Sequence, residues 1–155
     1  MRTTRTTLAS WVSLAWGLVL ARYGGSDDVV FGMTFAHRPA EVPRVEEIVG
    51  ALFNTVPFRL ELGDAVTIGA AVQRTFEALS EDARHAHLDP AAIQRASGRS
   101  SGRELFDTAV RVQTVPPPRN KGPFTIESQS LEDPWHYVAC LVVTPGEPLV
   151  CRLDF

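Results

Sequence analysis

An almost uninterrupted apolar segment of strand length, Val29–Ala36, most restricts what this chain can fold into. Only a glycine and a threonine interrupt its large apolar side chains, and such a run is typical of a strand that is covered on both faces. A polar turn, Ser26-Asp27-Asp28, precedes the run, and His37-Arg38-Pro39 ends it, because proline lacks the N–H that a β-ladder requires. The chain is therefore expected to build a sheet and to supply elements that cover it.

The apolar segment before this strand, Leu8–Ala21, has two interpretations. Two arginines precede it, which is compatible with a secretory signal. As a helix, it has one apolar stripe with i, i+3, i+4, i+7 spacing, formed by Leu8, Trp11, Val12, Ala15, Leu18 and Val19. Thr6 or Thr7 would cap this helix, and Tyr23-Gly24-Gly25 would end it. We favour the folded helix, because serines and tryptophans dilute the segment and it is too short to span a bilayer.

The rest of the chain alternates between extended and helical patterns. A strand is expected over Thr55–Leu62, and an amphipathic helix over Ala65–Arg84 with Asp64 as its N-cap. The other expected elements are a helical turn at Val45–Gly50, a helix from Asp89-Pro90 to Ala96, strands at Leu105–Val115, Phe124–Ser128, His136–Val143 and Leu149–Phe155, and a proline-rich loop at Pro116–Gly122.

This order of elements predicts an α/β fold, namely a two-layer sandwich in which helices pack on a mixed, mainly antiparallel sheet. Val29–Ala36 and Thr55–Leu62 are expected to be neighbours in that sheet. The helices Thr7–Arg22 and Ala65–Arg84 are expected to pack on it, because their apolar stripes need a core.

The composition restricts the possible binding partners of the chain and its cellular compartment. A net charge of −3 over 155 residues gives no basic surface for nucleic acid or for an anionic membrane. Two cysteines, Cys140 and Cys151, are too few for a disulfide framework and favour a cytoplasmic location. A type II turn centred on Pro145-Gly146 would place these cysteines opposite each other. The two cysteines could then form a strained disulfide or remain two buried free thiols. We favour the two free thiols.

Few side chains suggest chemistry. His85, His87 and Asp89 are close in sequence, but the i, i+2 spacing of the histidines is poor for a helical metal site. We assign them to a helix end and to the N-cap of the next helix, and expect no metal. His37, beside Arg38 at a strand end, is the best single candidate for ligand contact, and an ordinary surface histidine is the alternative interpretation. The sequence has neither a nucleophile elbow nor a phosphate-binding glycine loop, so no catalytic residue is expected in this chain.

Several segments, in order, resemble the second half of the condensation domain of nonribosomal peptide synthetases. The most specific segment is similar to the family's GxFxNTxPxR motif and includes Gly50, Asn54, Thr55, Pro57 and Arg59. The other matching segments are Thr7–Tyr23, Gly25–Gly32 with Asp28 and Gly32, Arg38–Pro43, His87–Arg95, Glu104–Thr108 with Phe106 and Asp107, and the stretch from Pro145 to the end.

The chain also departs from the family. Ala36-His37 stands where the family usually has Ser-Gly, and Gln113-Thr114-Val115-Pro116 replaces Glu-Asn-Tyr-Pro. The paired-histidine motif with its downstream Asp-Gly, which the family carries in its N-terminal half, has no counterpart here.

The resemblance implies one lobe of a fold like that of chloramphenicol acetyltransferase, in which two lobes enclose a tunnel. Residues 1–155 would form the C-terminal lobe, without the N-terminal lobe. The family forms an amide bond between two thioesters, which carrier proteins present on phosphopantetheine arms, so this lobe would bind no cofactor directly. His37 and Arg38 would be tunnel candidates, and the other motif residues would shape the lobe.

Two hypotheses follow. The chain is either part of an active condensation enzyme, or a non-catalytic platform that docks an adjacent adenylation or carrier domain. In both cases a face left by the N-terminal lobe is expected to be apolar and to bind that lobe or to form a homodimer. A small secreted protein is a third option, but the family resemblance through Leu8–Tyr23 counts against it.

Overall fold

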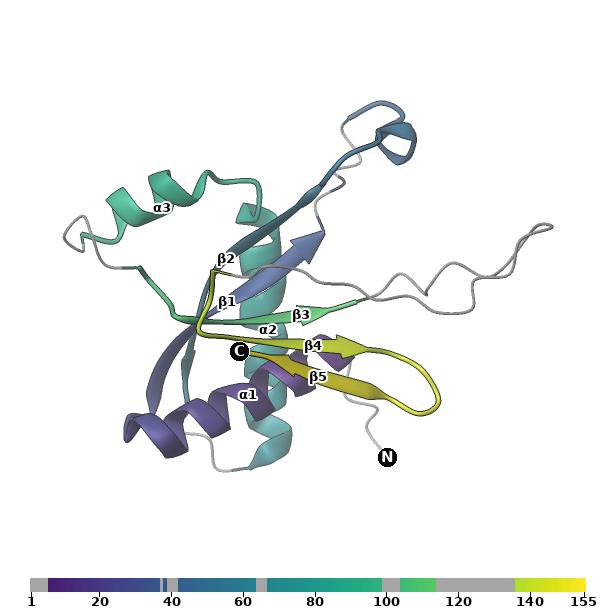
Figure 1. The fold of residues 1–155 in the computed structure, drawn as a ribbon. Helices are drawn as coiled ribbons and strands as arrows, with labels where there is room; N and C mark the ends of the chain where they lie inside the picture. The colour runs from purple at the N-terminus through teal and green to yellow at the C-terminus, as the bar shows by residue number, and fades with distance from the viewer. Residues whose placement is uncertain (1–5, 37, 39–41, 64–66, 99–103, 114–135) are drawn as a thin grey trace.

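Figure 1 shows a five-stranded sheet with two long helices on one of its faces. The computed structural model describes residues 6–36, 38, 42–63, 67–98, 104–113 and 136–155. The strands are β1 (Asp28–Ala36), β2 (Phe53–Glu61), β3 (Thr108–Val112), β4 (Ala139–Thr144) and β5 (Val150–Asp154). The helices are α1 (Leu8–Gly24), α2 (Ile68–His85) and the short α3 (Pro90–Ala96), and a 3₁₀ turn, η1, covers Val45–Glu47. The predicted two-layer α/β fold is confirmed.

The sheet is mixed, with the strand order β2-β1-β3-β4-β5. β1 pairs with β2 in the antiparallel direction along its whole length, from Asp28 opposite Glu61 to Ala36 opposite Phe53. β3 runs parallel to both β1 and β4, and β5 is antiparallel to β4. The prediction that the first two strands are neighbours is confirmed, and the described part of the sheet has equal numbers of parallel and antiparallel pairs.

The core lies between the helices and one face of the sheet. Phe31 on β1 and Phe58 on β2 are fully buried, and their rings meet edge to face with centroids 5.4 Å apart. The other buried members of this cluster are Leu14, Val29, Met33, Leu60, Val72, Leu79 and Val110. Each such side chain stabilises the fold by roughly 1.5–3 kcal/mol relative to exposure, which fixes both long helices on the same face.

The face of α1 that packs on the sheet is not the predicted one. Its buried residues are Ser10, Ser13, Leu14 and Gly17. Of the predicted stripe of Leu8, Trp11, Val12, Ala15, Leu18 and Val19, Val12 packs against the core cluster, whereas Trp11, Ala15, Leu18 and Val19 are exposed, so the stripe is wrong as the core-facing side. Small residues let the helix approach closely, since a Cβ at Gly17 would collide with the side chain of Leu60. The buried hydroxyls have partners: Ser10 Oγ donates to the Thr7 carbonyl at 2.7 Å, and Ser13 Oγ lies 3.7 Å from Met33 Sδ.

Local capping explains where the helices begin and end. Thr7 caps α1 in a capping box and Gly25, with φ 67°, ends it, both as predicted. The N-cap of α2 is Thr67, whose side chain accepts from the Ala70 N–H at 3.2 Å, and not Asp64 as predicted. The helix therefore begins at Ile68, and residues 64–66 lie outside the described residues. Asp89 caps α3, with Pro90 in its first turn, as predicted.

The hairpin of β4 and β5 has a different register from the predicted one. Cys140 is opposite Asp154, and Cys151 is opposite Val143, so the two cysteines do not face each other. The loop between the strands is longer than a two-residue turn, because Pro148 as well as Pro145 lacks an N–H for the ladder. Both cysteines are free thiols, as expected, but only Cys140 is buried. Cys151 is exposed, so the expectation that both thiols are buried is wrong for Cys151.

β3 and β4 are shorter than predicted at their starts. β3 begins at Thr108 rather than Leu105, and β4 at Ala139 rather than His136. The residues just before each strand, Phe106 and Tyr137, leave the strand path to pack against each other, with ring centroids 5.4 Å apart. The expected strand Phe124–Ser128 and the loop Pro116–Gly122 lie outside the described residues.

Candidate functional site

Most of the motif residues are connected with one surface, the side of the sheet opposite α1 and α2, here called the open face. Side chains alternate along a strand, so Gly32 on β1 points away from the core that Phe31 enters. Thr55 and Arg59 on β2 lie on the same side, because they pair with Thr34 and Val30 of β1.

An aromatic ring lies directly against the backbone at the centre of the open face. A Cβ at Gly32 would collide with the ring of Phe106 and come within 2.8 Å of Thr55 Cγ2. Glycine is therefore required at this position, so that Phe106 can pack on β1 and β2. This contact brings together Gly32, Thr55 and Phe106, which belong to three separate motif segments.

Hydroxyl-bearing side chains neighbour Gly32 and Phe106 on the open face. Thr34 Oγ1 and Thr55 Oγ1 form a hydrogen bond of 2.9 Å across the β1–β2 pair. Partial burial raises the pKa of the Tyr137 phenol, and a hydrogen bond with Thr55 partly opposes that shift. Tyr137 therefore stays protonated at neutral pH and can donate a hydrogen bond, but it is a poor base.

A cation lies beside the hydroxyl cluster. The guanidinium carbon of Arg111 on β3 is 5.6 Å from the centre of the Phe53 ring at the start of β2, which is within cation–π range. Thr34, Arg111 and Tyr137 are not among the residues predicted from the sequence. The alternation along β1 could have placed Thr34 on the face of Gly32, but the positions of Arg111 and Tyr137 depend on the parallel pairing of β3 with β1 and β4.

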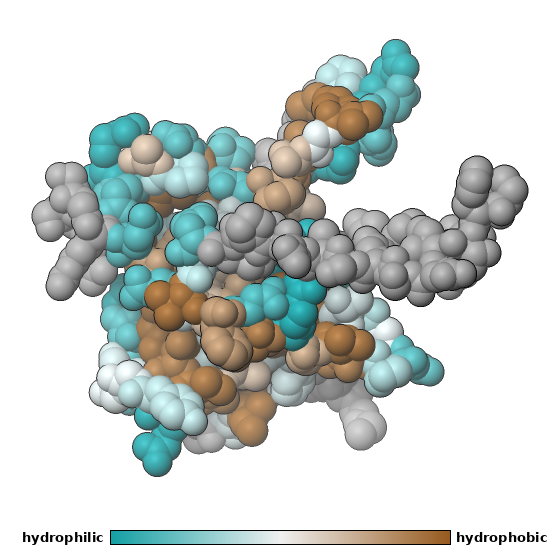
Figure 2. Space-filling model, viewed as in Figure 1, coloured by the Kyte–Doolittle hydropathy of each residue, from teal (hydrophilic) through white to brown (hydrophobic). Residues whose placement is uncertain are grey.

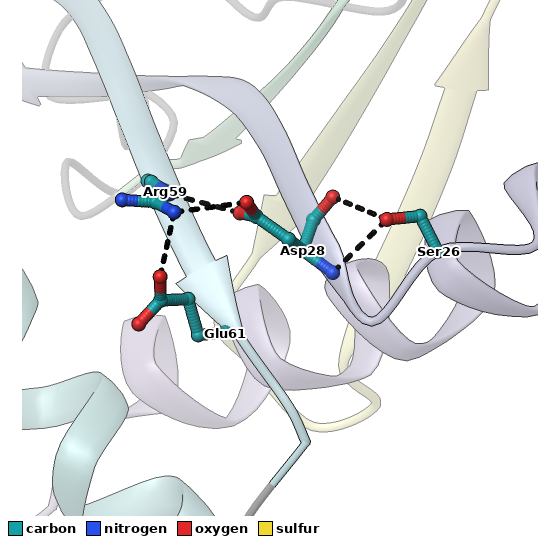
Figure 3. A network of polar contacts seen from close by, with 4 residues as sticks. All are labelled: Ser26, Asp28, Arg59 and Glu61. Atoms are coloured by element: carbon teal, nitrogen blue, oxygen red, sulfur yellow. Dashed lines mark hydrogen bonds and ion pairs between the residues drawn. The ribbon is translucent and has the colours of Figure 1, made fainter.

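The edge of the open face carries a charged network (Figure 3). Arg59 donates to both carboxylate oxygens of Asp28, each at 2.9 Å, and its guanidinium also lies 2.6 Å from Glu61 Oε1. Ser26 Oγ accepts from the Asp28 N–H at 3.2 Å and donates to the Asp28 carbonyl at 3.0 Å. The hydrogen bonds from Arg59 hold the pKa of the Asp28 carboxyl below its ordinary value.

This network lines an open cleft of about 630 Å³, between the Asp28 end of β1 and Arg74 and Ala78 of α2. The motif residues Asp28 and Arg59 thus form one pair across the β1–β2 ladder. Their separation in sequence gives no sign of the contact, which needs the register of the hairpin.

Asn54 lies on the other side of β2 from Thr55 and holds the end of α2. Its side-chain amide donates to the carbonyls of Ala86 and Leu88, both at 2.9 Å. These residues, with His87 and Asp89, line a shallow pocket of about 310 Å³.

The remaining motif residues have backbone roles. Gly50 is exposed, with φ 153°, and precedes β2. Pro57 is half-buried opposite Gly32 on the edge strand, where a missing N–H is tolerated. The Asp107 carbonyl accepts from the Val138 N–H at 2.8 Å and so ties the starts of β3 and β4 together.

Of the two tunnel candidates, His37 lies outside the described residues. Arg38 is held by the turn that follows β1, because its guanidinium donates to the carbonyls of Val45 and Ile48 at 2.6 and 3.5 Å. His85 on α2 lies 3.4 Å from Glu81 Oε1. The part of the chain that the structure describes contains no group of three or more His, Cys, Asp or Glu side chains arranged for a metal ion. No helix within that part has both the length and the apolar character to cross a membrane.

Comparison with known proteins gives concordant matches. The model of the condensation domain matches residues 1–133. Chondramide synthase cmdD of Chondromyces crocatus is 32% identical over 153 residues, which are 97% of this chain and 4% of that protein. Malformin synthetase mlfA of Aspergillus tubingensis is 34% identical over 128 residues, which are 82% of this chain and 2% of that protein.

Solved structures share the fold. One, described as the crystal structure of CT, superposes with a TM-score of 0.77 at 19% sequence identity. The superposition includes 99% of this chain and 36% of that structure. The starter condensation domain of rhizomide synthetase gives a TM-score of 0.69 at 22% identity, with 95% of this chain covering 35% of that structure. The chain therefore spans about a third of each of these structures and a few per cent of the synthetases.

Proposed function

Because the chain belongs to the condensation domain family, we propose that it is the C-terminal lobe of a condensation domain in a nonribosomal peptide synthetase. The observation that carries the proposal is the match of the condensation-domain model to residues 1–133. The fold supports it, because it superposes on about a third of the length of solved structures that share it. The resemblance of the Gly50–Arg59 segment to the family's later motif supports the assignment to the second lobe.

In the proposed reaction, the amine of one carrier-bound aminoacyl thioester attacks the carbonyl carbon of another carrier-bound acyl thioester. A C–N bond forms, the C–S bond breaks, and the proton lost by the amine ends on the released thiol of the donor carrier. The group that positions or deprotonates the amine is a histidine of the other lobe, as the family resemblance implies. This chain would hold one wall of the tunnel.

The open face suits the role of a tunnel wall. The Phe106 ring is fixed against Gly32, and the Thr34–Thr55 hydroxyl pair is held across two strands. A wall with fixed side chains can keep two thioesters in register, and misplacement by about 1 Å can cost on the order of a hundredfold in rate. We propose His37 and Arg38 as further tunnel residues, because they follow β1 directly.

The partners of this lobe would be the N-terminal lobe and the carrier and adenylation domains of the synthetase. Carrier proteins would present both substrates on phosphopantetheine arms, which enter as part of the substrates and not as a cofactor of this chain. We also propose a cytoplasmic location, which the free thiols of Cys140 and Cys151 support.

A second candidate function is a docking platform without catalysis. The hydrogen bonds of the polar motif residues favour it, because Asn54, Arg59 and Arg38 all donate to groups within the chain. A platform needs a rigid surface, and these contacts supply rigidity without exposing a reactive group.

The test is a reconstitution with two loaded carrier proteins, in which the dipeptidyl thioester is followed by mass spectrometry. We expect no product with this chain alone and product when it is co-expressed with the N-terminal lobe. Robust turnover by the chain alone, abolished by His37→Ala, would show a one-lobe enzyme and contradict the proposal. Absence of product from both lobes together, although they form a stable complex, would favour the docking platform.

A further inference from the structure

The sheet divides beyond the middle of β1. This strand lies between β2 and β3 in the strand order and pairs with β2 along its whole length. Its pairing with β3 is restricted to Gly32 and Met33. β3 continues beside β4 through Val112, and the Gln113 N–H still donates to the Val143 carbonyl at 2.8 Å. β1 and β3 therefore diverge toward their C-terminal ends, as Figure 1 shows.

The exposure of β1 changes where β3 leaves it. Residues 31–33 are buried, whereas Thr34 and Phe35 are half-buried and Ala36 is exposed. Figure 2 shows that the connection from β1 to β2, of which residues 42–52 are described, projects from the body of the molecule beyond the end of β1. These residues therefore do not fold back over Ala36, and the end of an interior strand remains accessible.

The alternation of the backbone indicates which groups of β1 lose a strand partner there. Pro57 of β2 is opposite Gly32 and has no N–H, so this pair does not exchange hydrogen bonds. By alternation, the backbone groups of Gly32, Thr34 and Ala36 are directed away from β2 and toward β3. The 2.9 Å hydrogen bond between the hydroxyls of Thr34 and Thr55 agrees with this, because side chains lie closer in pairs of this kind. The Thr34 carbonyl and both backbone groups of Ala36 thus have no partner on β3.

We propose that this exposed end of β1, Thr34–Ala36, binds the peptide backbone of a peptidyl thioester donor, which lies alongside β1 as a short strand where β3 has left it. Main-chain hydrogen bonds to an exposed strand edge are a general way to bind an extended peptide. The inference rests on the proposed function and adds the substrate class to it, since the donor is a peptidyl rather than an aminoacyl group. Recognition of the backbone would not depend on the side chains of the donor.

The spacing of the exposed groups favours a peptide over the pantetheine arm that carries it. Groups directed to one side of a strand recur at every second residue, about 6.6 Å apart, and a peptide of α-amino acids repeats them at the same interval. The two amides of pantetheine are separated by a β-alanine unit, whose additional methylene group breaks this interval. Phe35 and Val112 pack against the core cluster, so apolar side chains occupy the side toward the helices. The donor would therefore approach from the open face.

The variant that tests the proposal is Ala36→Pro, which removes the N–H of Ala36. Because that N–H is directed away from β2, the pairing of β1 with β2 should persist, and circular dichroism and urea unfolding check this. Ala51→Pro is the matched control. Ala51 is an exposed residue that precedes β2, and it is the central residue of a tight turn in which the Leu52 N–H donates to the Gly50 carbonyl at 3.1 Å. The fixed φ of proline fits such a turn.

The assay uses the chain co-expressed with the N-terminal lobe and compares a tripeptidyl donor with an aminoacyl donor on the same carrier protein. The product is followed by mass spectrometry. We expect Ala36→Pro to lower kcat/KM about tenfold for the tripeptidyl donor, as the loss of a hydrogen bond does, and less than about twofold for the aminoacyl donor. Ala51→Pro should change neither value.

The outcomes separate this inference from the proposed function. An equal loss with both donors would overturn the inference alone, because both donors share the pantetheine arm, and so would an unchanged kcat/KM of Ala36→Pro with the tripeptidyl donor. Absence of product from either donor with the wild-type lobes would contradict the proposed function and the inference with it.

Hydrogen exchange tests the exposed edge without catalysis or a variant. In the free chain, followed by NMR, the amide of Ala36 should exchange much faster than the buried amide of Met33, which is directed toward β2. Equally slow exchange of the two amides would show that the end of β1 is already paired, and would overturn the inference.

Discussion

Removal of the Asn54 amide should loosen the end of α2 from the sheet. The amide bridges β2 to the Ala86 and Leu88 carbonyls, which follow the last residue of α2, and Ala86 is completely buried. Asn54→Ala therefore removes both hydrogen bonds at once and leaves a carbonyl of a buried residue without this donor.

The magnitude follows from the two bonds. A typical intramolecular hydrogen bond contributes about 0.5–1.5 kcal/mol, and an unsatisfied buried acceptor costs about 1–3 kcal/mol. We expect Asn54→Ala to lower the free energy of unfolding by about 1–3 kcal/mol, which corresponds to a decrease in Tm of roughly 2–4 °C per kcal/mol for a chain of this size. Asn54→Asp should be worse at neutral pH, because a carboxylate would face two carbonyl oxygens.

Equilibrium unfolding in urea, with tryptophan fluorescence as the probe, measures this change. The control is Gln73→Ala, which removes another side-chain amide, from an exposed hydrogen bond with Glu77 on α2. We expect that control to change stability by less than about 0.5 kcal/mol. An Asn54→Ala protein as stable as the Gln73→Ala protein, with an unchanged m-value, would refute the reasoning.

Three further outcomes are expected. Gly32→Ala should destabilise the chain by about 1–3 kcal/mol through its clash with Phe106, whereas Gly24→Ala, whose Cβ meets nothing within 4 Å, should be neutral or slightly stabilising in the same urea assay. Arg59→Met should raise the pKa of the Asp28 carboxyl toward the ordinary value of about 3.9, as followed by NMR titration. Arg59 lowers that pKa in the folded state, so the ion pair stabilises the fold at pH values above the pKa of Asp28 in the unfolded chain. This stabilisation is lost as the pH falls through the folded-state pKa. The difference in stability between the wild type and Arg59→Met should therefore shrink below about pH 4. Thr7→Ala should cost about 1 kcal/mol by removing the α1 cap, and an unchanged thermal transition would contradict this.

The elements that could be predicted are those whose sequence patterns lie within a few neighbouring residues. The run Val29–Ala36 is a strand because its large apolar residues reach the core at every second position. The ends of α1 and α3 follow from Thr7, Gly25 and Asp89, whose side chain or backbone freedom closes the helix locally. Asp64 is a suitable cap by residue type, but Thr67 lies next to the first helical residue and supplies the hydrogen bond.

The site depends on contacts that no local pattern contains. Phe106 and Tyr137 lie just before the strands that were predicted to contain them, where Phe106 packs over Gly32 and Tyr137 packs against Phe106. The pairing of Asp28 with Arg59 needs the β1–β2 register, and the separation of Cys140 from Cys151 needs the true length of the last loop. Periodicity also could not decide which side of α1 is buried, because both sides are suitable for an apolar environment.

The polar groups at the open face and its edge differ in what they could contribute to the proposed reaction. Asn54 and Arg59 donate to groups within the chain, and both are donors rather than proton acceptors. Tyr137 has a raised pKa and stays protonated at neutral pH, while Asp28, whose pKa is lowered, is held as a carboxylate by Arg59 at the edge of the sheet. None of these described groups can take a proton from an attacking amine at the centre of the open face. If the chain works in amide formation, these four residues would therefore hold the substrates in register rather than take the proton of the amine.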